Sequence, residues 1–260
     1  MRFKLFTPIL FFILFGFLLG CQDDKLKDQN KETVLEDTKI PNKESKATKD
    51  KKVKWVKVLE SPKNISSPSE AVIHQYEVTF KDEKKEFPKK DSVIFETTLG
   101  GSSIVAIHSP EGENNYAIFL YEYNSSNKWI INGLLRLLGG RGFTDKEGLD
   151  LPMNKFNALN LTISEKNKKI WTFADEKEIV TITVSNRVPF VEHSDPKKIS
   201  LSNGNEAYIS KDHLKNSYLY YFDTGKTIVV SGNVSEQNII NLANSLPSVN
   251  STFFPSPEVD

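Results

Sequence analysis

Residues 158–184, ALNLTISEKNKKIWTFADEKEIVTITV, contain the pattern that decides the fold class. Three runs of β-branched, aromatic and aliphatic residues occupy positions 158–163, 169–174 and 178–184, and segments rich in Lys, Asn, Asp and Glu separate them. Runs of this length between turn residues are typical of β-strands. Because the separating segments are short, consecutive strands must pair antiparallel, so the stretch predicts an antiparallel sheet.

Similar short runs extend this pattern along the chain from Val53 onward. Pro, Gly and Asn at residues 109–115 lie between apolar runs at 103–107 and 116–123, which predicts a hairpin with a long loop. Further strand-like runs occur at residues 76–80, 92–96, 128–131, 207–209, 218–221 and 227–232.

Few segments have helical periodicity. In residues 235–246, Ser235 can cap the first turn, the apolar residues form one stripe, and Pro247 follows. Residues 133–140, GLLRLLGG, are interpreted as a second short helix bounded by glycines. The sequence therefore predicts an α+β fold, mainly antiparallel β-sheet with one or two packing helices.

Two parts of the chain share one order of features. In residues 101–133, and again in 204–232, a strand, an Asn-containing loop, an aromatic strand and a Lys-led strand ending at Gly follow one another. The offset of roughly a hundred residues suggests a duplicated unit, with related sheet-rich lobes at residues 53–143 and 150–250. The alternative is that any two meanders of short strands look alike.

The N-terminal residues 1–21, MRFKLFTPILFFILFGFLLGC, have the layout of a secretory signal. Arg2 and Lys4 form a positive head, an apolar run follows, and Gly20 precedes Cys21, the single cysteine of the chain. The apolar run is shorter than the roughly 20 residues that a membrane-spanning helix needs. An export signal is therefore expected.

The last four residues of this segment, Leu-Leu-Gly-Cys, resemble the lipobox of bacterial lipoproteins. Gly20 fits this family, whereas Leu19 departs from its usual Ala or Ser. The resemblance implies that residues 1–20 are a signal peptide, that fatty acids such as palmitate modify Cys21, and that the protein is held on the extracytoplasmic face of the cell membrane. The alternatives are an uncleaved anchor and a plain signal peptide. The abundance of Lys, Asn, Ser and Ile is typical of low-GC Gram-positive bacteria.

The segment after the cysteine is strongly polar. Residues 22–52 have few apolar side chains and no aromatic one, so they cannot bury enough surface to offset chain entropy. Residues 21–52 are therefore expected to be a lipidated cysteine and a disordered tether, with a span of roughly 30 Å for about thirty flexible residues. At the other end, residues 251–260 contain two prolines and are expected to fray.

Composition excludes several functional classes. The 34 basic and 34 acidic residues cancel, and a nucleic-acid partner would need a strongly basic face. With the single thiol of Cys21 used for lipid, disulfides, a CxxC zinc site and a cysteine nucleophile are excluded. No cofactor is predicted.

No catalytic motif stands out. The histidines are too far apart in sequence for a short metal-binding motif such as HExxH, although His193 with Asp195, or His213 with Asp212, could contribute ligands if folding brought them together. Ser102 follows two glycines but lacks the strand-turn-helix setting of a hydrolase nucleophile. Isolated histidines in polar turns are usually solvated, so neither a metal site nor a catalytic residue is predicted.

One loop is a candidate ligand site. Gly139, Gly140 and Gly142 flank Arg141, and backbone amides with an arginine can hold an anion. The Lys and hydroxyl residue of a phosphate-binding P-loop are missing, so a plain turn is the alternative, and Arg136 and Arg141 are kept as candidate ligand residues. The nearby acids Glu147 and Asp150 could resemble a glycosidase pair, but such spacing is common.

Aromatic residues are dense in the proposed repeat, and a core role is their default. If both copies exposed one aromatic face, a peptide, glycan or protein would be expected to bind there. These residues are Tyr116, Phe119, Tyr121, Tyr123, Tyr218, Tyr220, Tyr221 and Phe222.

The strands at 207–209, 218–221 and 227–232, with the closing segment 234–246, carry a second resemblance. This part resembles a domain of unknown function found in Gram-positive lipoproteins and at the extracytoplasmic ends of sigma-factor regulators. The resemblance implies location and fold class, and it implies no catalytic residue.

The sequence thus predicts a membrane-anchored, non-enzymatic binding or sensing module of the cell envelope, with an envelope protein as the candidate partner. An envelope hydrolase or a solute- or lipid-binding lipoprotein is the alternative. A deep pocket lined by two histidines and a carboxylate, or by Arg136 and Arg141, would favour a hydrolase or solute binding. A large apolar cavity between sheet and helix would favour lipid handling.

Overall fold

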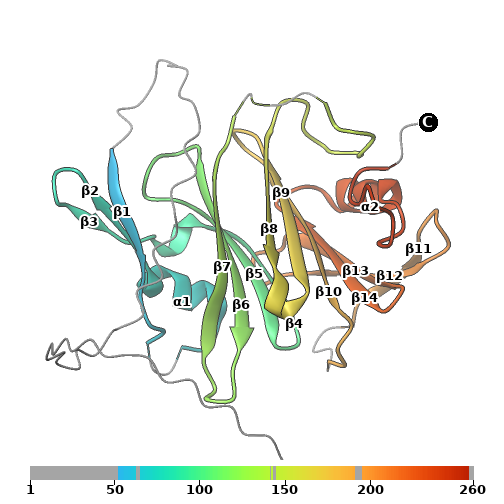
Figure 1. Cartoon of the computed structure of the whole chain (residues 1–260), viewed down its shortest axis with the longest axis horizontal. Coiled ribbons are helices and arrows are strands. Elements are labelled where there is room, and N and C mark those ends of the chain that lie inside the picture. The colour runs from blue at the N-terminus through green and yellow to red at the C-terminus, as the bar shows by residue number, and fades with distance from the viewer. Residues whose placement is uncertain (1–51, 63–64, 141, 143–144, 191–194, 258–260) are drawn as a thin grey trace, which may run out of the picture. The chain divides into compact units, whose positions relative to one another are not determined.

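The computed structural model describes residues 52–62, 65–140, 142, 145–190 and 195–257. These residues form three antiparallel sheets and two α-helices (Figure 1), so the predicted α+β class dominated by antiparallel sheet is confirmed. None of the helices in this described part is long and apolar enough to cross a membrane.

The central sheet has four strands in the order β4-β5-β6-β7. The predicted hairpin with a long loop is present, because β5 and β6 pair antiparallel on either side of the turn at residues 109–114. The strands are β4 (Val93–Leu99), β5 (Ser102–His108), β6 (Asn115–Tyr123) and β7 (Trp129–Leu138), and a 3₁₀ turn, η1 (Lys90–Ser92), leads into β4.

The prediction of a helix at residues 133–140 is wrong, because strand β7 continues through this segment as far as Leu138. β7 pairs with β6 from Trp129 to Leu138 with one register shift between Ile131 and Gly133, and Leu135 and Leu137 lie on the buried face with period two. Gly133 does not mark a helix end. A Cβ there would lie 2.9 Å from Leu161 Cδ2, so glycine permits the close approach of the next strand.

The second sheet has seven strands in the order β11-β12-β13-β14-β10-β9-β8. The three strands predicted within residues 158–184 are β8, β9 and β10, and the pairing of β10 with β14 joins them to the later meander. The strands are β8 (Asn157–Ile163), β9 (Lys168–Ala174), β10 (Ile179–Asn186), β11 (Lys197–Ser200), β12 (Glu206–Lys211), β13 (Ser217–Asp223) and β14 (Lys226–Gly232), with η2 (Ser164–Lys166) between β8 and β9.

The remaining elements cover the outer faces. A three-stranded sheet consists of β1 (Val53–Val58), β2 (Tyr76–Phe80) and β3 (Lys85–Glu86). Helix α1 (Pro68–Gln75) begins at the Ser67 cap and ends where β2 begins. Helix α2 (Glu236–Ser245) occupies the predicted position, and it packs against β13 and β14.

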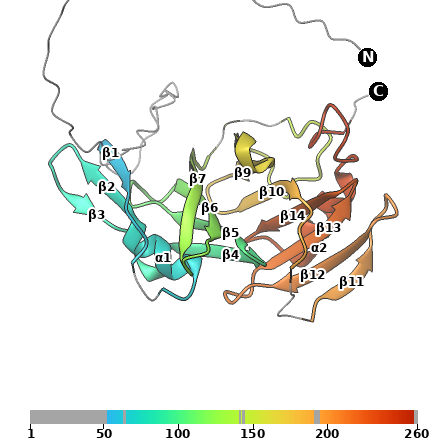
Figure 2. The same cartoon turned by 60° about the horizontal axis from the view of Figure 1, so that its bottom comes forward.

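The core follows these layers. One face of the four-stranded sheet packs against α1 and β2, with Tyr76 and Phe119 in edge-to-face contact at 5.1 Å. Its other face packs against the seven-stranded sheet through a shared cluster that includes Ile118 and Ile170. The opposite face of the seven-stranded sheet is covered by α2 and by residues 149–156. Figure 2 shows the four-stranded sheet between the other two.

The two segments compared in the proposed repeat, residues 101–133 and 204–232, fold as the antiparallel meanders β5-β6-β7 and β12-β13-β14. The segments that follow differ, since β14 leads into α2 whereas the later part of the first copy stays in strand β7. Because one buried cluster joins strands of both halves, the lobes at residues 53–143 and 150–250 share a core.

The expected frayed end is replaced by packed turns over residues 251–257. The Phe254 ring contacts Trp171 at a centroid distance of 5.3 Å, and Pro255 is buried. The contact of the Phe254 ring with β9 offsets the entropy of ordering the chain end. Residues 258–260 lie outside the described residues, as do the proposed signal peptide and nearly all of the proposed tether.

Candidate functional site

A cavity of about 360 Å³ lies against β8 and β9, on the face that points away from the four-stranded sheet. The register places Ala158 opposite Phe173 and Asn160 opposite Trp171, so these four side chains share one face. Residues 145–149 and the turn at 253–256 form the remaining walls. A volume of this size is within the roughly 300–1,000 Å³ typical of small-molecule sites.

Aromatic side chains line much of this cavity, which we name the aromatic pocket. Phe156 and Phe173 are buried and meet edge to face at 5.7 Å, whereas Phe253 is 59% exposed at the rim. The lining residues are Asp145, Lys146, Glu147, Leu149, Phe156, Ala158, Leu159, Asn160, Trp171, Phe173, Phe253, Pro255 and Ser256. Apolar walls with a few polar groups are the usual composition of a ligand site.

Hydrogen bonds hold the polar rim of the aromatic pocket in place. Lys146 Nζ donates to the Leu151 carbonyl at 2.6 Å, and the Glu147 amide donates to Asp145 Oδ1 at 2.8 Å. Ser256 Oγ donates to Glu147 Oε2 at 2.6 Å, which ties this loop to the C-terminal turn. The two walls therefore support each other.

The acids Glu147 and Asp150 are not brought together in this pocket. Glu147 lines it, whereas Asp150 is absent from the lining, and its amide donates to Ser245 Oγ at 2.9 Å. The glycosidase-like interpretation of this pair finds no support in the geometry of the described residues.

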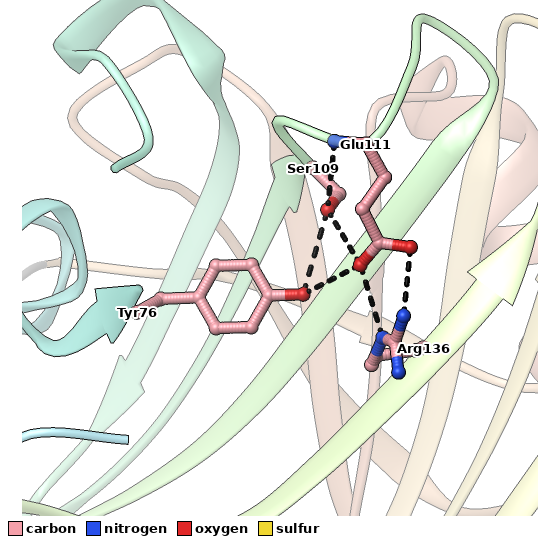
Figure 3. Close-up of polar contacts among 4 residues, drawn as sticks. All are labelled: Tyr76, Ser109, Glu111 and Arg136. Atoms are coloured by element: carbon pink, nitrogen blue, oxygen red, sulfur yellow. Dashed lines mark hydrogen bonds and ion pairs between the residues drawn. The ribbon is translucent and has the colours of Figure 1, made fainter. Parts of the chain in front are cut away.

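Arg136 lies in a polar cluster on the other side of the protein core. It extends from β7 and makes a two-pronged contact with Glu111, with Nε to Oε1 at 3.0 Å and Nη2 to Oε2 at 2.7 Å. Figure 3 shows that the Tyr76 hydroxyl and Ser109 complete the cluster, donating to Glu111 Oε1 at 3.0 and 3.1 Å. Burial, and then the Glu111 carboxylate, raise the Tyr76 pKa, so the phenol stays protonated.

The candidate ligand loop is therefore only partly placed. The Arg136 guanidinium is engaged by the Glu111 carboxylate, which pins the turn after β5 to strand β7. Arg141 and Cys21 lie outside the described residues.

The histidines remain separate where they are described. His108 Nδ1 lies 3.2 Å from the Glu113 carbonyl and its ring lies against Tyr116, whereas His74 and His213 are exposed. His193 is outside the described part. Among the described residues, no three His, Cys, Asp or Glu side chains cluster as metal ligands.

Most aromatic residues of the two meanders lie in the core, which is the role predicted for them by default. Tyr116, Phe119 and Tyr121 are buried in the first copy, and Tyr218, Tyr220 and Tyr221 in the second. Tyr123 is 47% exposed, so it is an exception at a strand end.

The aromatic pocket, apart from Glu147, was not anticipated from the sequence. Its walls come from three separate segments, and Trp171 looks like an ordinary strand residue until Phe254 packs against it. The pair of phenylalanines at 253 and 254, after the predicted helix, is the one local signal of an ordered C-terminal turn.

Comparison with known proteins supplies no family for the chain. No protein-family model matches it, and no curated protein matches it at a significant level.

Proposed function

We propose that this protein is a lipid-anchored, non-enzymatic binding module on the extracytoplasmic face of the cell membrane, and that it binds a small ligand in the aromatic pocket. The observation that carries the binding function is the 360 Å³ cavity with aromatic walls and a hydrogen-bonded polar rim. An envelope hydrolase is the competing function.

The anchor is supported by the order of features at the N-terminus. A positive head, an apolar run and a small residue precede Cys21, and a polar segment follows it. Two acyl chains hold a protein on a bilayer far more firmly than one, because each buried methylene contributes about 0.8 kcal/mol. A folded body that begins at β1 would then be carried outside the membrane.

The anchor is tested by Cys21→Ser in cells fed an alkyne analogue of palmitate. The wild type should incorporate the label and partition with membranes, whereas Cys21→Ser, which has no other thiol, should incorporate none. Equal labelling of the two proteins would contradict lipidation.

Ligand binding is tested by ligand-observed NMR of the full chain in detergent with a set of small-molecule fragments. Fragments that bind the wild type and Trp55→Leu, but not Trp171→Leu, would support the aromatic pocket. Trp55 is the matched control because it is 46% exposed on β1 and does not line the cavity. Absence of binding, or binding kept in Trp171→Leu, would contradict the proposal, and chemical turnover of a bound fragment would favour the hydrolase.

A further inference from the structure

A second cavity, of about 50 Å³, lies between the four-stranded and seven-stranded sheets, and we name it the inter-sheet pocket. Strands β4, β5 and β6 form one wall, and β9, β10 and β14, with Val188 and Phe190 after β10, form the other. The lining residues are Thr97, Leu99, Ser102, Ser103, Ile104, Leu120, Lys168, Thr183, Ser185, Val188, Phe190, Thr227 and Val229. More than half of them are hydroxyl or charged residues, which is unusual between two packed sheets.

Strand register explains why these side chains converge. Thr183 pairs with Ile170 on one side and with Val229 on the other, and Ser185 pairs with Thr227. Residues paired across a sheet share a face, so these hydroxyls point toward the four-stranded sheet, as does the cluster around Ile170.

Lys168 places a buried ammonium group at this pocket. Its side chain is 7% exposed, and Nζ donates to Ser102 Oγ at 3.2 Å and to Glu122 Oε1 at 3.3 Å. An ammonium group has three donors. The third has no acceptor among the described residues, although burial makes an unused donor costly.

Thr183 places an unpaired hydroxyl at the same pocket. It is 5% exposed, lines the same pocket, and its Oγ1 has no hydrogen-bond partner in the described part of the chain. The neighbouring Thr181 does have one, since its hydroxyl lies 3.0 Å from Ser231 Oγ. A buried hydroxyl without a partner calls for an explanation, and a bound ligand supplies one.

The local charge favours an anion. Partial burial alone would raise the Glu122 pKa, but hydrogen bonds and charges from Lys166 and Lys168 lower it overall. Glu122 is therefore ionised, and two ammonium groups surround one carboxylate, with Lys166 Nζ at 3.1 Å and Lys168 Nζ at 3.3 Å. Lys166, Lys168 and Glu122 together carry one net positive charge.

Size and apolar lining define the rest of the ligand. A cavity of about 10–15 Å³ holds one water molecule. The inter-sheet pocket of about 50 Å³ therefore admits only a few non-hydrogen atoms. Leu99, Phe190 and Val229 are apolar lining residues, and Val188 is 61% exposed. A short apolar tail can therefore leave the pocket past Val188.

We propose that the inter-sheet pocket binds a small monocarboxylate, whose oxygen atoms accept hydrogen bonds from Lys168 Nζ and Thr183 Oγ1 while a short alkyl group contacts Phe190 and Leu99. This site is separate from the aromatic pocket, and it does not depend on the lipid anchor.

The test is a titration of the full-length wild type in detergent with sodium propionate at constant ionic strength, followed by NMR line broadening of ¹³C-labelled propionate. Saturable binding is expected. Thr183→Val keeps the shape and removes the hydroxyl, and it should weaken binding about 2- to 10-fold. Lys168→Met should weaken it at least about tenfold, because a charge-assisted hydrogen bond is lost.

Lys166→Met is the matched control, because Lys166 pairs with the same Glu122 but is 50% exposed and does not line the pocket. It should reduce affinity less than Lys168→Met. Circular dichroism checks that each variant is folded. No saturable binding by the wild type, or unchanged binding by folded Thr183→Val and Lys168→Met, would overturn the proposal. Equal competition by chloride would overturn the carboxylate assignment.

Discussion

Tyr116 illustrates how burial controls a single side chain. Its ring on β6 is 1% exposed, and its hydroxyl has no hydrogen-bond partner among the described residues. Burial, followed by the carboxylates of Asp175 and Glu176, raises its pKa to about 12. The unpaired hydroxyl therefore destabilises the folded state, whereas the ring packs in the shared core.

Tyr116→Phe should keep or increase stability at neutral pH, by up to about 1–2 kcal/mol, because it removes an unpaired buried hydroxyl and retains the ring. The folded-state pKa of Tyr116 lies above the unfolded value near 10, because the folded state disfavours the ionised phenol. This group therefore causes no pH-dependent loss of stability below pH 10, and stability falls as pH rises from 10 through 12. The variant should therefore lose less stability than the wild type between pH 10 and 12.

Urea unfolding at pH 7 and at pH 11 measures both effects. Tyr123→Phe is the control, because Tyr123 lies on the same strand but is 47% exposed. The interpretation fails if Tyr116→Phe is destabilised at pH 7 by more than this control.

At the scale of elements, α2 is the segment whose boundaries local chemistry sets most clearly. The Ser235 side chain accepts a hydrogen bond from the Asn238 amide at 3.2 Å, and Leu246 ends the helix just before Pro247. Ile239 and Leu242 are fully buried against the sheet. The cap and the apolar stripe are both visible in the sequence, so the helix could be predicted.

Ser235→Ala should lower the free energy of unfolding by about 1 kcal/mol, because one amide at the start of α2 loses its acceptor. Ser235→Thr retains a capping hydroxyl and should stay within a few tenths of a kcal/mol of the wild type. Thermal and urea unfolding measure the difference. Equal stability of the Ala and Thr variants would show that the cap contributes nothing.

Strand β7 shows where local patterns fail. A run of four leucines around Arg136 suits a helix as well as a strand, and glycines at both ends look like helix boundaries. Pairing with β6 and the close approach of Leu161 to Gly133 select the strand. Both contacts come from residues distant in sequence, so local propensity cannot include them.

At the scale of the whole molecule, one core joins the two sheet-rich halves. Ile118 on β6 and Ile170 on β9 are both fully buried in the cluster between the sheets. Burial across this boundary predicts that the described body unfolds as one cooperative unit.

Ile118→Ala should destabilise the whole body by about 2–5 kcal/mol, because it leaves a cavity between the sheets. Ile130→Ala, at a β7 position that is 42% exposed, should cost less than about 0.5 kcal/mol. Unfolding is followed by tryptophan fluorescence and by far-UV circular dichroism. Two separate transitions in the wild type, with only one of them shifted by Ile118→Ala, would show that the halves unfold independently.

Sequence patterns alone predict the strand-rich class, the strands within residues 158–184, helix α2 and the hairpin of β5 and β6. These features depend on periods of two or 3.6 residues and on turn or cap residues, which are local. The sequence also supplies the hypothesis of a lipid on Cys21, which remains a prediction because it concerns processing rather than packing.

Contacts between distant parts of the chain determine that residues 133–138 are a strand, that Arg136 binds Glu111, and that the C-terminal turn packs on Trp171. The tertiary structure also forms the aromatic pocket, and it places Lys168 and Thr183 at one cavity. Each of these depends on strand order and register, which join residues from different parts of the chain. A sheet can place such residues side by side in many ways, and the packing of the complete core selects one.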